Sequence, residues 1–371
     1  MQHLLKTALR LLLCALLSLP VFADVVEEME KLTCGDYTYV LLEDGGARIT
    51  GYDGDDAELT VPDELDGYPV REIGENAFSF CNSLTSVILP DSLSSIGDDA
   101  FSRCSFLTSI TLPDSLTSIG GNPFSGCSSL VKIDVSPDNP VFAQTDGVLY
   151  EKATKTLICY PAGKAGDSFA VPDGILIIGD DAFFSCEALI SVTLPDSLTS
   201  IGGNPFSSCS SLVKIDVSPD NPVFAQTDGV LYEKATKTLI CYPAGKAGDS
   251  FAVPNGILVI GDDAFSFCNS LTSITLPDGL ASIGDFAFSG CYSLTSVTLP
   301  DGLTSIGDLA FFYCSSLTSV TLPDSLTSIG YFAFMGCPGG LTLIVSQDSY
   351  AHQYAIDNGL SYTHPDVNDW P

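Results

Sequence analysis

Cysteine is the residue type whose spacing comes closest to supporting chemistry in this sequence. Nine cysteines share one recurring position: Cys81, Cys104, Cys127, Cys186, Cys209, Cys268, Cys291, Cys314 and Cys337. In stacked repeats, neighbouring cysteines would lie within disulfide range on Cα distance alone. No Cys-x-x-Cys pair or adjacent histidine accompanies them, so the sequence predicts no zinc site and no other cofactor. We interpret each cysteine as a small buried apolar residue and leave the disulfide alternative open.

Aspartates also recur, at two positions of the same period. Those that follow a predicted strand are Asp91, Asp114, Asp196, Asp278, Asp301 and Asp324, and those that follow a glycine are Asp98, Asp99, Asp180, Asp181, Asp262, Asp263, Asp285 and Asp308. Calcium would relieve the repulsion between stacked carboxylates, whereas turn capping and solubility explain the pattern without a ligand. A repeated aspartate is a poor candidate for a single catalytic acid, so we predict no enzyme and keep carbohydrate hydrolysis as a remote alternative.

These residues belong to a repeat whose inward-facing side chains can be read from one unit, residues 104–126. The predicted inward set is Leu107, Ile110, Leu112, Leu116, Ile119 and Phe124. Residues 109–112 alternate with a period of two, which predicts a strand that Pro113 ends. We expect Gly120 to adopt a positive φ at the next corner, and residues 124–127 to form a short helical turn.

The repeat length predicts the architecture. Successive cysteines of this position lie 23 residues apart, except for two steps of 59. A fixed period in this range indicates a solenoid, because one unit cannot bury its apolar edge alone. We therefore predict a β-rich α/β solenoid, a leucine-rich-repeat superhelix with a curved parallel sheet and two β-hairpin insertions.

The motif Leu-x-x-Ile-x-Leu-Pro-x-x-Leu-x-x-Ile-Gly-x-x-Ala-Phe-x-x-Cys resembles the BspA-like leucine-rich repeats of bacterial surface proteins over roughly residues 36–363. The resemblance implies a surface or secreted interaction module, and some such proteins are adhesins for host matrix, mucosa or other microbes. The sequence departs from the common leucine-rich repeat after the strand, where Pro113-Asp114-Ser115 replaces the usual asparagine or cysteine.

The chain divides into a leader, two caps and a solenoid. The predicted parts are a signal peptide at 1–23, an N-terminal β cap with the first repeat at 24–78, the solenoid at 79–340 with hairpin inserts near 138–170 and 220–252, and a C-terminal cap and tail at 341–371. A short apolar core behind Lys6 and Arg10 is typical of a secretory signal. No later apolar run is long enough for a transmembrane segment.

The charge distribution separates two regions of the chain. With 46 acidic and 14 basic residues, the net charge is -32, which excludes a phosphate-backbone binder and so predicts no nucleic acid partner. Eight lysines lie in the two units that hold the inserts, and none of the residues from 247 onward is Lys or Arg. An acidic field of this kind attracts cationic partners.

Two sets of outward residues are candidates for binding. The inserts offer Lys152, Lys155, Tyr160, Lys234, Lys237 and Tyr242, and the outward strand positions offer a hydroxyl stripe that includes Thr111, Thr193, Thr275, Thr298 and Thr321. Solenoids use such extended faces for binding, although β-propensity and cross-strand pairing explain the same threonines. We expect an exported, secreted or cell-surface protein that binds a protein or glycoprotein ligand. A cell-envelope scaffold or self-associating protein is the alternative, and the oligomeric state stays open.

Overall fold

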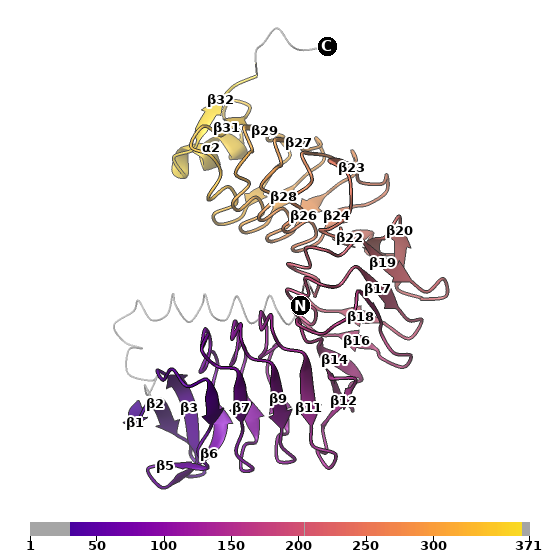
Figure 1. Ribbon diagram of the computed structural model, residues 1–371. Helices are drawn as coiled ribbons and strands as arrows, with labels where there is room; N and C mark the ends of the chain where they lie inside the picture. Colours follow the sequence, from indigo (N-terminus) through magenta and orange to yellow (C-terminus); the bar gives the residue numbers. More distant parts are fainter. Residues whose placement is uncertain (1–29, 204, 366–371) are drawn as a thin grey trace.

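The chain winds into a parallel β-solenoid that curves into an open arc, with the sequence running from one end of the arc to the other (Figure 1). The computed structural model describes residues 30–203 and 205–365. The predicted signal peptide, residues 1–23, lies outside the described residues. Each turn of the solenoid contributes one strand to each of two columns.

The first column consists of three parallel sheets built from the strands that the repeat motif predicts. The first sheet holds β4 (Glu58–Thr60), β7 (Ser86–Ile88), β9 (Ser109–Leu112) and β11 (Lys132–Val135). The second holds β15 (Ser168–Ala170), β17 (Ser191–Leu194) and β19 (Lys214–Val217). The third holds β23 (Ser250–Ala252), β25 (Ser273–Thr275), β27 (Ser296–Thr298), β29 (Ser319–Thr321), β31 (Thr342–Ile344) and β32 (Ser361–Thr363).

A second column, formed mainly by Ser-Ile pairs before the glycine, was not part of the prediction. Its strands are β6 (Tyr68–Ile73), β8 (Ser95–Ile96) and β10 (Ser118–Ile119), then β14 (Thr156–Cys159), β16 (Ile177–Ile178) and β18 (Ser200–Ile201), then β22 (Thr238–Cys241), β24 (Val259–Ile260), β26 (Ser282–Ile283), β28 (Ser305–Ile306) and β30 (Ser328–Ile329). Two-residue strands carry no alternation that a sequence pattern could reveal.

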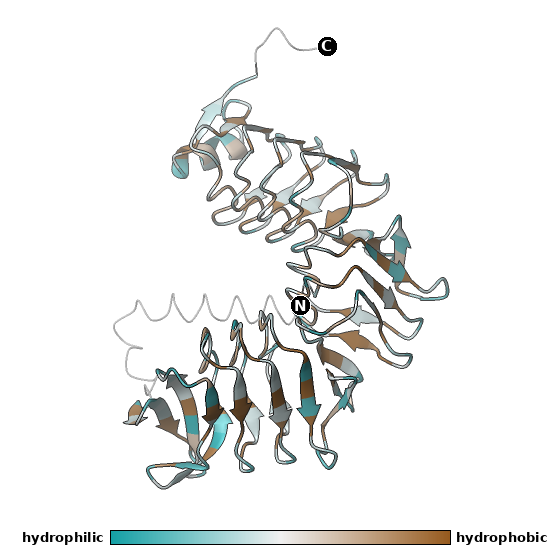
Figure 2. Cartoon of the chain, in the orientation of Figure 1, coloured by the Kyte–Doolittle hydropathy of each residue, from teal (hydrophilic) through white to brown (hydrophobic). Residues whose placement is uncertain are grey.

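The inward side chains of each turn fill the space between the columns. Leu107, Ile110, Leu112, Leu116 and Phe124 are buried as predicted, and Ile119 is partly buried against the same core. Figure 2 shows apolar and polar residues alternating along the long strands, as a half-buried sheet requires.

Aromatic rings stack under the turn that follows the second column, in three stacks separated by the two inserts. The rings of Phe265, Phe288 and Phe311 stack with centroids 5.1 Å apart between each consecutive pair. Backbone bonds join these turns across repeats, for example from the Phe288 N–H to the Ala310 carbonyl at 2.7 Å. The predicted helical turns are hydrogen-bonded turns, and α2 (Tyr350–Asp357) is the one α-helix of the described residues. The fold is therefore a β-solenoid, and the prediction of an α/β solenoid is corrected.

The recurring glycine of the Ile-Gly pair has a different structural role from the one expected. Gly120 is absent from the residues with positive φ, and a Cβ at this position would lie 2.6 Å from the backbone nitrogen of Asp98 in the preceding repeat. The glycine therefore permits close stacking of repeats. Positive φ values occur instead two residues later in the motif, for example 52° at Asp99.

The strands of the two inserts are part of the solenoid, where they separate one hydrophobic core from the next. β12 (Phe142–Thr145), β13 (Val148–Glu151) and β14 pair antiparallel, and β14 then continues the second column by pairing parallel with β16. Val148 and Tyr150 are buried in the core that follows, whereas Leu149 is buried in the core that precedes. The strands β20 (Phe224–Thr227) and β21 (Val230–Glu233) repeat this arrangement with β22 in the second copy.

A buried asparagine follows the last strand of each of the first two sheets of the first column. Asn139 is 1% exposed, and its Nδ2 donates to the carbonyls of Pro113 and Leu116 at 2.7 and 2.9 Å. Its Oδ1 accepts from the backbone nitrogens of Val141 and Phe142 at 2.9 and 2.7 Å. Asn221 makes the same set of bonds in the second copy. Each side chain replaces the ladder bonds that the chain loses as it leaves the sheet.

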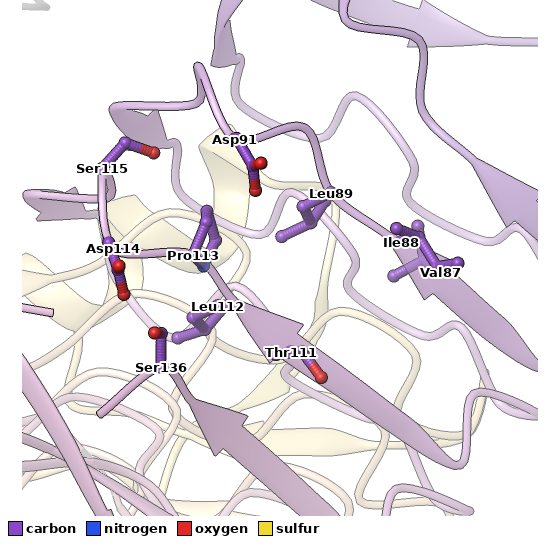
Figure 3. Close-up of a pocket in the computed structure, with 10 residues that line it drawn as sticks. All are labelled: Val87, Ile88, Leu89, Asp91, Thr111, Leu112, Pro113, Asp114, Ser115 and Ser136. Atoms are coloured by element: carbon purple, nitrogen blue, oxygen red, sulfur yellow. The ribbon is translucent and has the colours of Figure 1, made fainter. Parts of the chain in front are cut away.

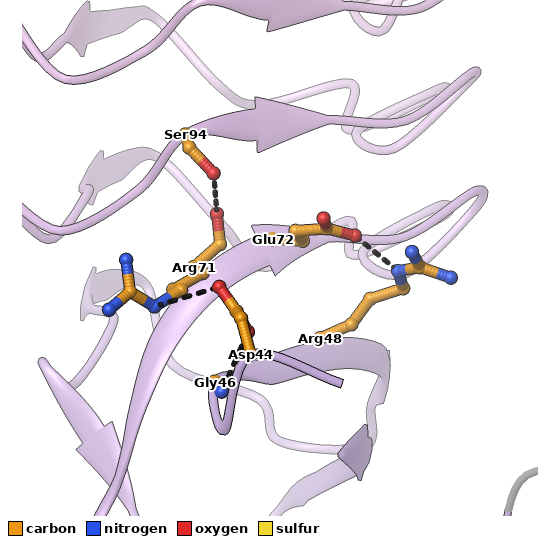
Figure 4. Close-up of polar contacts among 6 residues, drawn as sticks. All are labelled: Asp44, Gly46, Arg48, Arg71, Glu72 and Ser94. Carbon is orange, nitrogen blue, oxygen red and sulfur yellow. Dashed lines mark hydrogen bonds and ion pairs between the residues drawn. The ribbon is translucent and has the colours of Figure 1, made fainter. Parts of the chain in front are cut away.

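Antiparallel strands lie at the N-terminal end of the described chain. β1 (Leu32–Cys34), β2 (Tyr37–Leu41) and β3 (Ala47–Tyr52) form a meander, and β5 (Glu64–Leu65) pairs with β6. Figure 4 shows the ion pairs that join the meander to β6, Arg48 Nε to Glu72 Oε2 at 2.5 Å and Arg71 Nε to Asp44 Oδ2 at 3.4 Å. These pairs are partly exposed, so we assign each of them little free energy.

At the C-terminal end, α2 lies against the last turn. Ser349 caps the helix by accepting a bond from the His352 backbone nitrogen at 3.1 Å. Gly359, with a φ of 62°, follows the helix end.

Candidate binding surfaces

The predicted hydroxyl stripe is an exposed row of side chains on the first column. Its members Thr111, Thr193, Thr275, Thr298 and Thr321 are all exposed. In the third sheet, the strand register pairs Thr275 with Thr298 and Thr298 with Thr321, so the row is uninterrupted there. In the first two sheets, Thr111 and Thr193 pair with Asp134 and Asp216.

A second row of threonines, three residues earlier, has a structural role. The hydroxyls of Thr272, Thr295 and Thr318 donate to backbone carbonyls of the preceding repeat at 2.9, 3.0 and 3.3 Å. Thr275, Thr298 and Thr321 make no side-chain hydrogen bond to any other described residue. Their hydroxyls can therefore donate to or accept from a ligand without disturbing the ladder.

A groove of about 800 Å3 opens beside the stripe in the first sheet (Figure 3). Thr111 and Leu112 line it, with the carboxylates of Asp91 and Asp114 on the turns that follow the strands. Ile88, which is 63% exposed, takes the stripe position next to Thr111. Sequence reasoning missed Ile88, although it lies one repeat length before Thr111. The groove places hydrogen-bonding groups around the exposed side chain of Ile88, so a ligand could make polar and apolar contacts there.

The lysines of the inserts differ from one another in their contacts. The ammonium groups of Lys152 and Lys234 donate to the Asn139 and Asn221 carbonyls, both at 2.6 Å, and so support the buried asparagines. Lys155 and Lys237 are exposed at turn positions with φ of 56° and 55°. They have no ion-pair partner among the described residues. These two lysines are the free cations of the inserts.

Two of the predicted binding residues are core residues. Tyr160 and Tyr242 are each 3% exposed, and their rings stack on Phe183 and Phe265 with centroids 5.3 Å apart. Each tyrosine replaces the phenylalanine of the motif, as its position 23 residues before Phe183 or Phe265 in the sequence indicates. We therefore remove both from the candidate binding surface.

The aspartates after the glycine hold adjacent repeats together. Asp262 Oδ1 accepts from the Asp285 backbone nitrogen at 2.8 Å, and Asp285 Oδ1 accepts from the Asp308 backbone nitrogen at 2.7 Å. This ladder accounts, without a ligand, for the aspartates that directly follow the glycine. Within residues 30–203 and 205–365, no group of three or more His, Cys, Asp or Glu side chains is placed to hold a metal ion.

The cysteine column consists of free thiols, most of them buried. The thiol of Cys291 donates to the Phe265 carbonyl at 3.1 Å, and that of Cys314 donates to the Phe288 carbonyl at 3.2 Å. Burial raises the pKa of Cys291 to about 12, so the thiol stays protonated at neutral pH. The buried thiols therefore pack as small apolar residues, as the sequence predicts, with an added bond to a backbone carbonyl of the preceding repeat.

Two half-buried carboxyl groups, Asp181 and Asp263, lie in the turns that follow the motif glycine after each insert. Burial, with the nearby charges of Asp99 and Asp180, raises the pKa of Asp181 from 3.8 to about 6. Burial, with the charges of Asp181 and Asp262, raises the pKa of Asp263 to about 7. These groups face other carboxylates, so their environment disfavours the ionised form.

The two columns and the repeated turn motif define a leucine-rich-repeat β-solenoid. Residues 62–145, 162–227 and 244–358 match the BspA type leucine rich repeat region in six copies, over more than half of the chain. The chain belongs to this family.

Solved structures of bacterial leucine-rich-repeat proteins are similar to the chain. A leucine rich cell surface protein of Faecalibacterium prausnitzii is 28% identical, with a TM-score of 0.43, over 89% of this chain and 98% of that one. A leucine-rich repeat protein of Eubacterium ventriosum is 23% identical, with a TM-score of 0.52, over 85% and 78%. The pneumococcal vaccine antigen PcpA is 19% identical, with a TM-score of 0.41, over 91% and 99%. No curated protein is significantly similar.

Within the described residues, no helix has the length and apolar character needed to cross a membrane.

Proposed function

We propose that this protein is exported and acts without catalysis, by binding a protein or glycoprotein on a host or microbial surface. Its membership of the BspA type family and the description of one relative as a cell surface protein support the location. The predicted signal peptide at residues 1–23 supports export.

The observation that carries the proposal is the uninterrupted row of Thr275, Thr298 and Thr321. Three hydrogen-bonded parallel strands hold these exposed hydroxyls in register. Parallel strands are spaced about 4.8 Å apart, so the row presents a periodic polar surface. Such a surface complements an extended or repetitive macromolecule, which can contact several repeats at once.

Lys155 and Lys237 offer a second, separate contact region on the inserts. Both project from an identical turn in two copies of one unit, and neither has an ion-pair partner among the described residues. On a chain with a net charge of -32, two free cations at matching positions are suited to contact anionic groups of a ligand.

A self-associating envelope scaffold is the second candidate function. β32 is the last strand of the third sheet, and all three of its residues are exposed. A strand edge of this kind can pair with a strand of another chain. Sedimentation of purified residues 24–371 over a range of concentrations would reveal this association.

The test of the proposed function is solid-phase binding of residues 24–371 to matrix proteins, mucin and whole cells. The stripe variant Thr275→Val, Thr298→Val, Thr321→Val removes three hydroxyls but keeps β-branched side chains. The lysine variant Lys155→Ala, Lys237→Ala removes both free cations. We expect saturable binding that the stripe variant weakens most. Absence of binding to every surface would contradict the proposal.

A further inference from the structure

The last three complete turns carry an apolar row at a position that earlier turns reserve for asparagine or aspartate. The residue two places after the motif glycine is Asn76, Asp99, Asp181 or Asp263 in earlier repeats, with φ between 52° and 57°. In the last three turns the same position holds Phe286, Leu309 and Phe332, with φ of 53°, 54° and 54°. We call these three residues the C-terminal ridge.

The ridge residues are poorly suited to their backbone conformation. Asparagine and aspartate tolerate the left-handed region, whereas bulky apolar side chains are rarely found there. Phe286 is 37% exposed and Phe332 is 61% exposed, so neither gains the full benefit of burial. The stability of the solenoid does not account for this choice of residues.

The backbone fixes the ridge as a regular row. The Phe286 N–H donates to the Asp308 carbonyl, and the Leu309 N–H donates to the Tyr331 carbonyl, both at 2.9 Å. Tyr331, which is 74% exposed, adds an aromatic side chain directly beside Phe332. The row is therefore a rigid apolar surface, presented on successive turns.

Carboxylates directly precede two residues of the row, Asp285 before Phe286 and Asp308 before Leu309. Each of Asp262, Asp285 and Asp308 uses Oδ1 for a backbone bond to the next turn, at 2.8, 2.7 and 2.6 Å, which leaves Oδ2 available to solvent or a ligand. The same three aspartates line a groove of about 530 Å3 along β24, β26 and β28. No residue from 247 onward is Lys or Arg, so no cation of this part of the chain neutralises them.

We propose that the C-terminal ridge and its bordering groove dock a basic polypeptide segment of a partner protein. Apolar side chains of the segment would contact Phe286, Leu309 and Phe332, and its Lys or Arg side chains would pair with the Asp262, Asp285 and Asp308 carboxylates. The inference rests on the proposed function and specifies the chemistry of one partner. The charge favours this occupant over a second copy of the chain, which has 46 acidic and 14 basic residues.

The test measures fluorescence anisotropy of a labelled peptide of repeating Lys-Ser-Phe-Ser units with residues 24–371. Matched peptides replace every Lys by Glu or every Phe by Ser. The ridge variant is Phe286→Asn, Leu309→Asn, Phe332→Asn, which installs the residue that stands at Asn76. The charge variant is Asp262→Asn, Asp285→Asn, Asp308→Asn, which keeps an oxygen for each backbone bond. The control variant is Asp278→Asn, Asp301→Asn, Asp324→Asn, which removes three exposed charges from neighbouring turns of the same region.

We expect the ridge variant to keep or raise its melting temperature and to lose affinity about tenfold or more. The charge variant should lose affinity and show a weaker dependence on salt, while the control variant changes less than about twofold. Equal losses in the charge and control variants would show attraction by net charge alone, and would overturn the inference. Wild-type affinity in the ridge variant, or no binding of the peptide by the wild type, would also overturn it. If the peptide fails but the chain still binds surfaces through the stripe, the proposed function stands without this partner.

Discussion

The rings of Phe311 and Phe334 stack with their centroids 5.3 Å apart and their planes only 2° from parallel, although the residues lie one repeat apart in the sequence. The same pairing recurs between consecutive repeats, and Tyr160 and Tyr242 each begin a new stack after an insert. Within a stack, each ring packs against the ring of the next repeat, so cohesion between these turns depends on the stack.

Removing one ring from this stack should be costly. Phe311→Ala removes a fully buried aromatic side chain, so we expect the free energy of unfolding to fall by about 3–5 kcal/mol. Urea denaturation followed by circular dichroism measures the change. Asp301→Asn, at an exposed turn of the same region, should cost less than about 0.5 kcal/mol. Equal losses would show that the inward face has been misassigned.

Substitution of the buried Asn139, at the end of the first sheet, should also lower the free energy of unfolding. Asn139→Ala leaves two carbonyls and two amide nitrogens without their partners, so we expect a loss of about 3 kcal/mol or more. The neighbouring exposed variant Asp138→Ala is the control. Thermal unfolding that is unchanged in Asn139→Ala would mean that water replaces these bonds at little cost.

Asp181 and Asp263 should make the folded protein less stable as the pH rises. Because burial raises their pKa from 3.8 to about 6 and about 7, the folded chain binds these protons more tightly than the unfolded chain. Their contribution to the unfolding free energy therefore falls as pH rises from about 4 to about 7. Asp181→Asn with Asp263→Asn should stabilise the protein at pH 8, by an amount on the order of 1–3 kcal/mol per residue.

Thermal unfolding of this double variant and the wild type across the pH range checks the sign. The difference between the two should shrink as pH falls toward about 4, where the wild-type carboxyl groups are protonated. Asparagine also tolerates the positive φ of both positions, as Asn76 does in the first repeat. A difference that stays constant with pH would show that these carboxyl groups do not titrate as described.

Most cysteines should not react with thiol reagents while the protein is folded. Among the twelve described cysteines, nine are buried, and Cys34, Cys81 and Cys337 are half-buried. Burial keeps a thiol protonated and inaccessible, and only the thiolate reacts readily. Titration of reduced residues 24–371 with a thiol reagent should modify at most these three quickly, and all twelve after denaturation. Rapid modification of more than three would contradict the burial of the column.

The repeat itself could be predicted from the sequence, because its signals are periodic. The spacing of Leu107, Ile110 and Leu112 shows a strand with one buried face, and the 23-residue step shows how the strands stack. Register follows from these two facts, so the exposed positions of Thr275 and Thr298 were also predictable.

Other features depend on contacts that a local pattern does not record. The run Val148–Leu149–Tyr150 predicts a strand, but its burial on both faces follows from the two cores that meet there. The burial of Tyr160 could have been predicted from its distance of one repeat from Phe183, which places its ring in the aromatic stack. The left-handed position of Phe286 depends on backbone bonds between turns, which no sequence pattern here specified.

The central claim is that exposed side chains of the first column bind a surface macromolecule while the rest of the column holds the fold. The most direct measurement is the binding isotherm of residues 24–371 on mucin, matrix proteins and cells, beside the Thr275→Val, Thr298→Val, Thr321→Val variant. We expect saturable binding for the wild type, a loss of affinity of about tenfold or more in the variant, and equal melting temperatures for the two proteins. Binding by the variant that matches the wild type, or none by either, would contradict it.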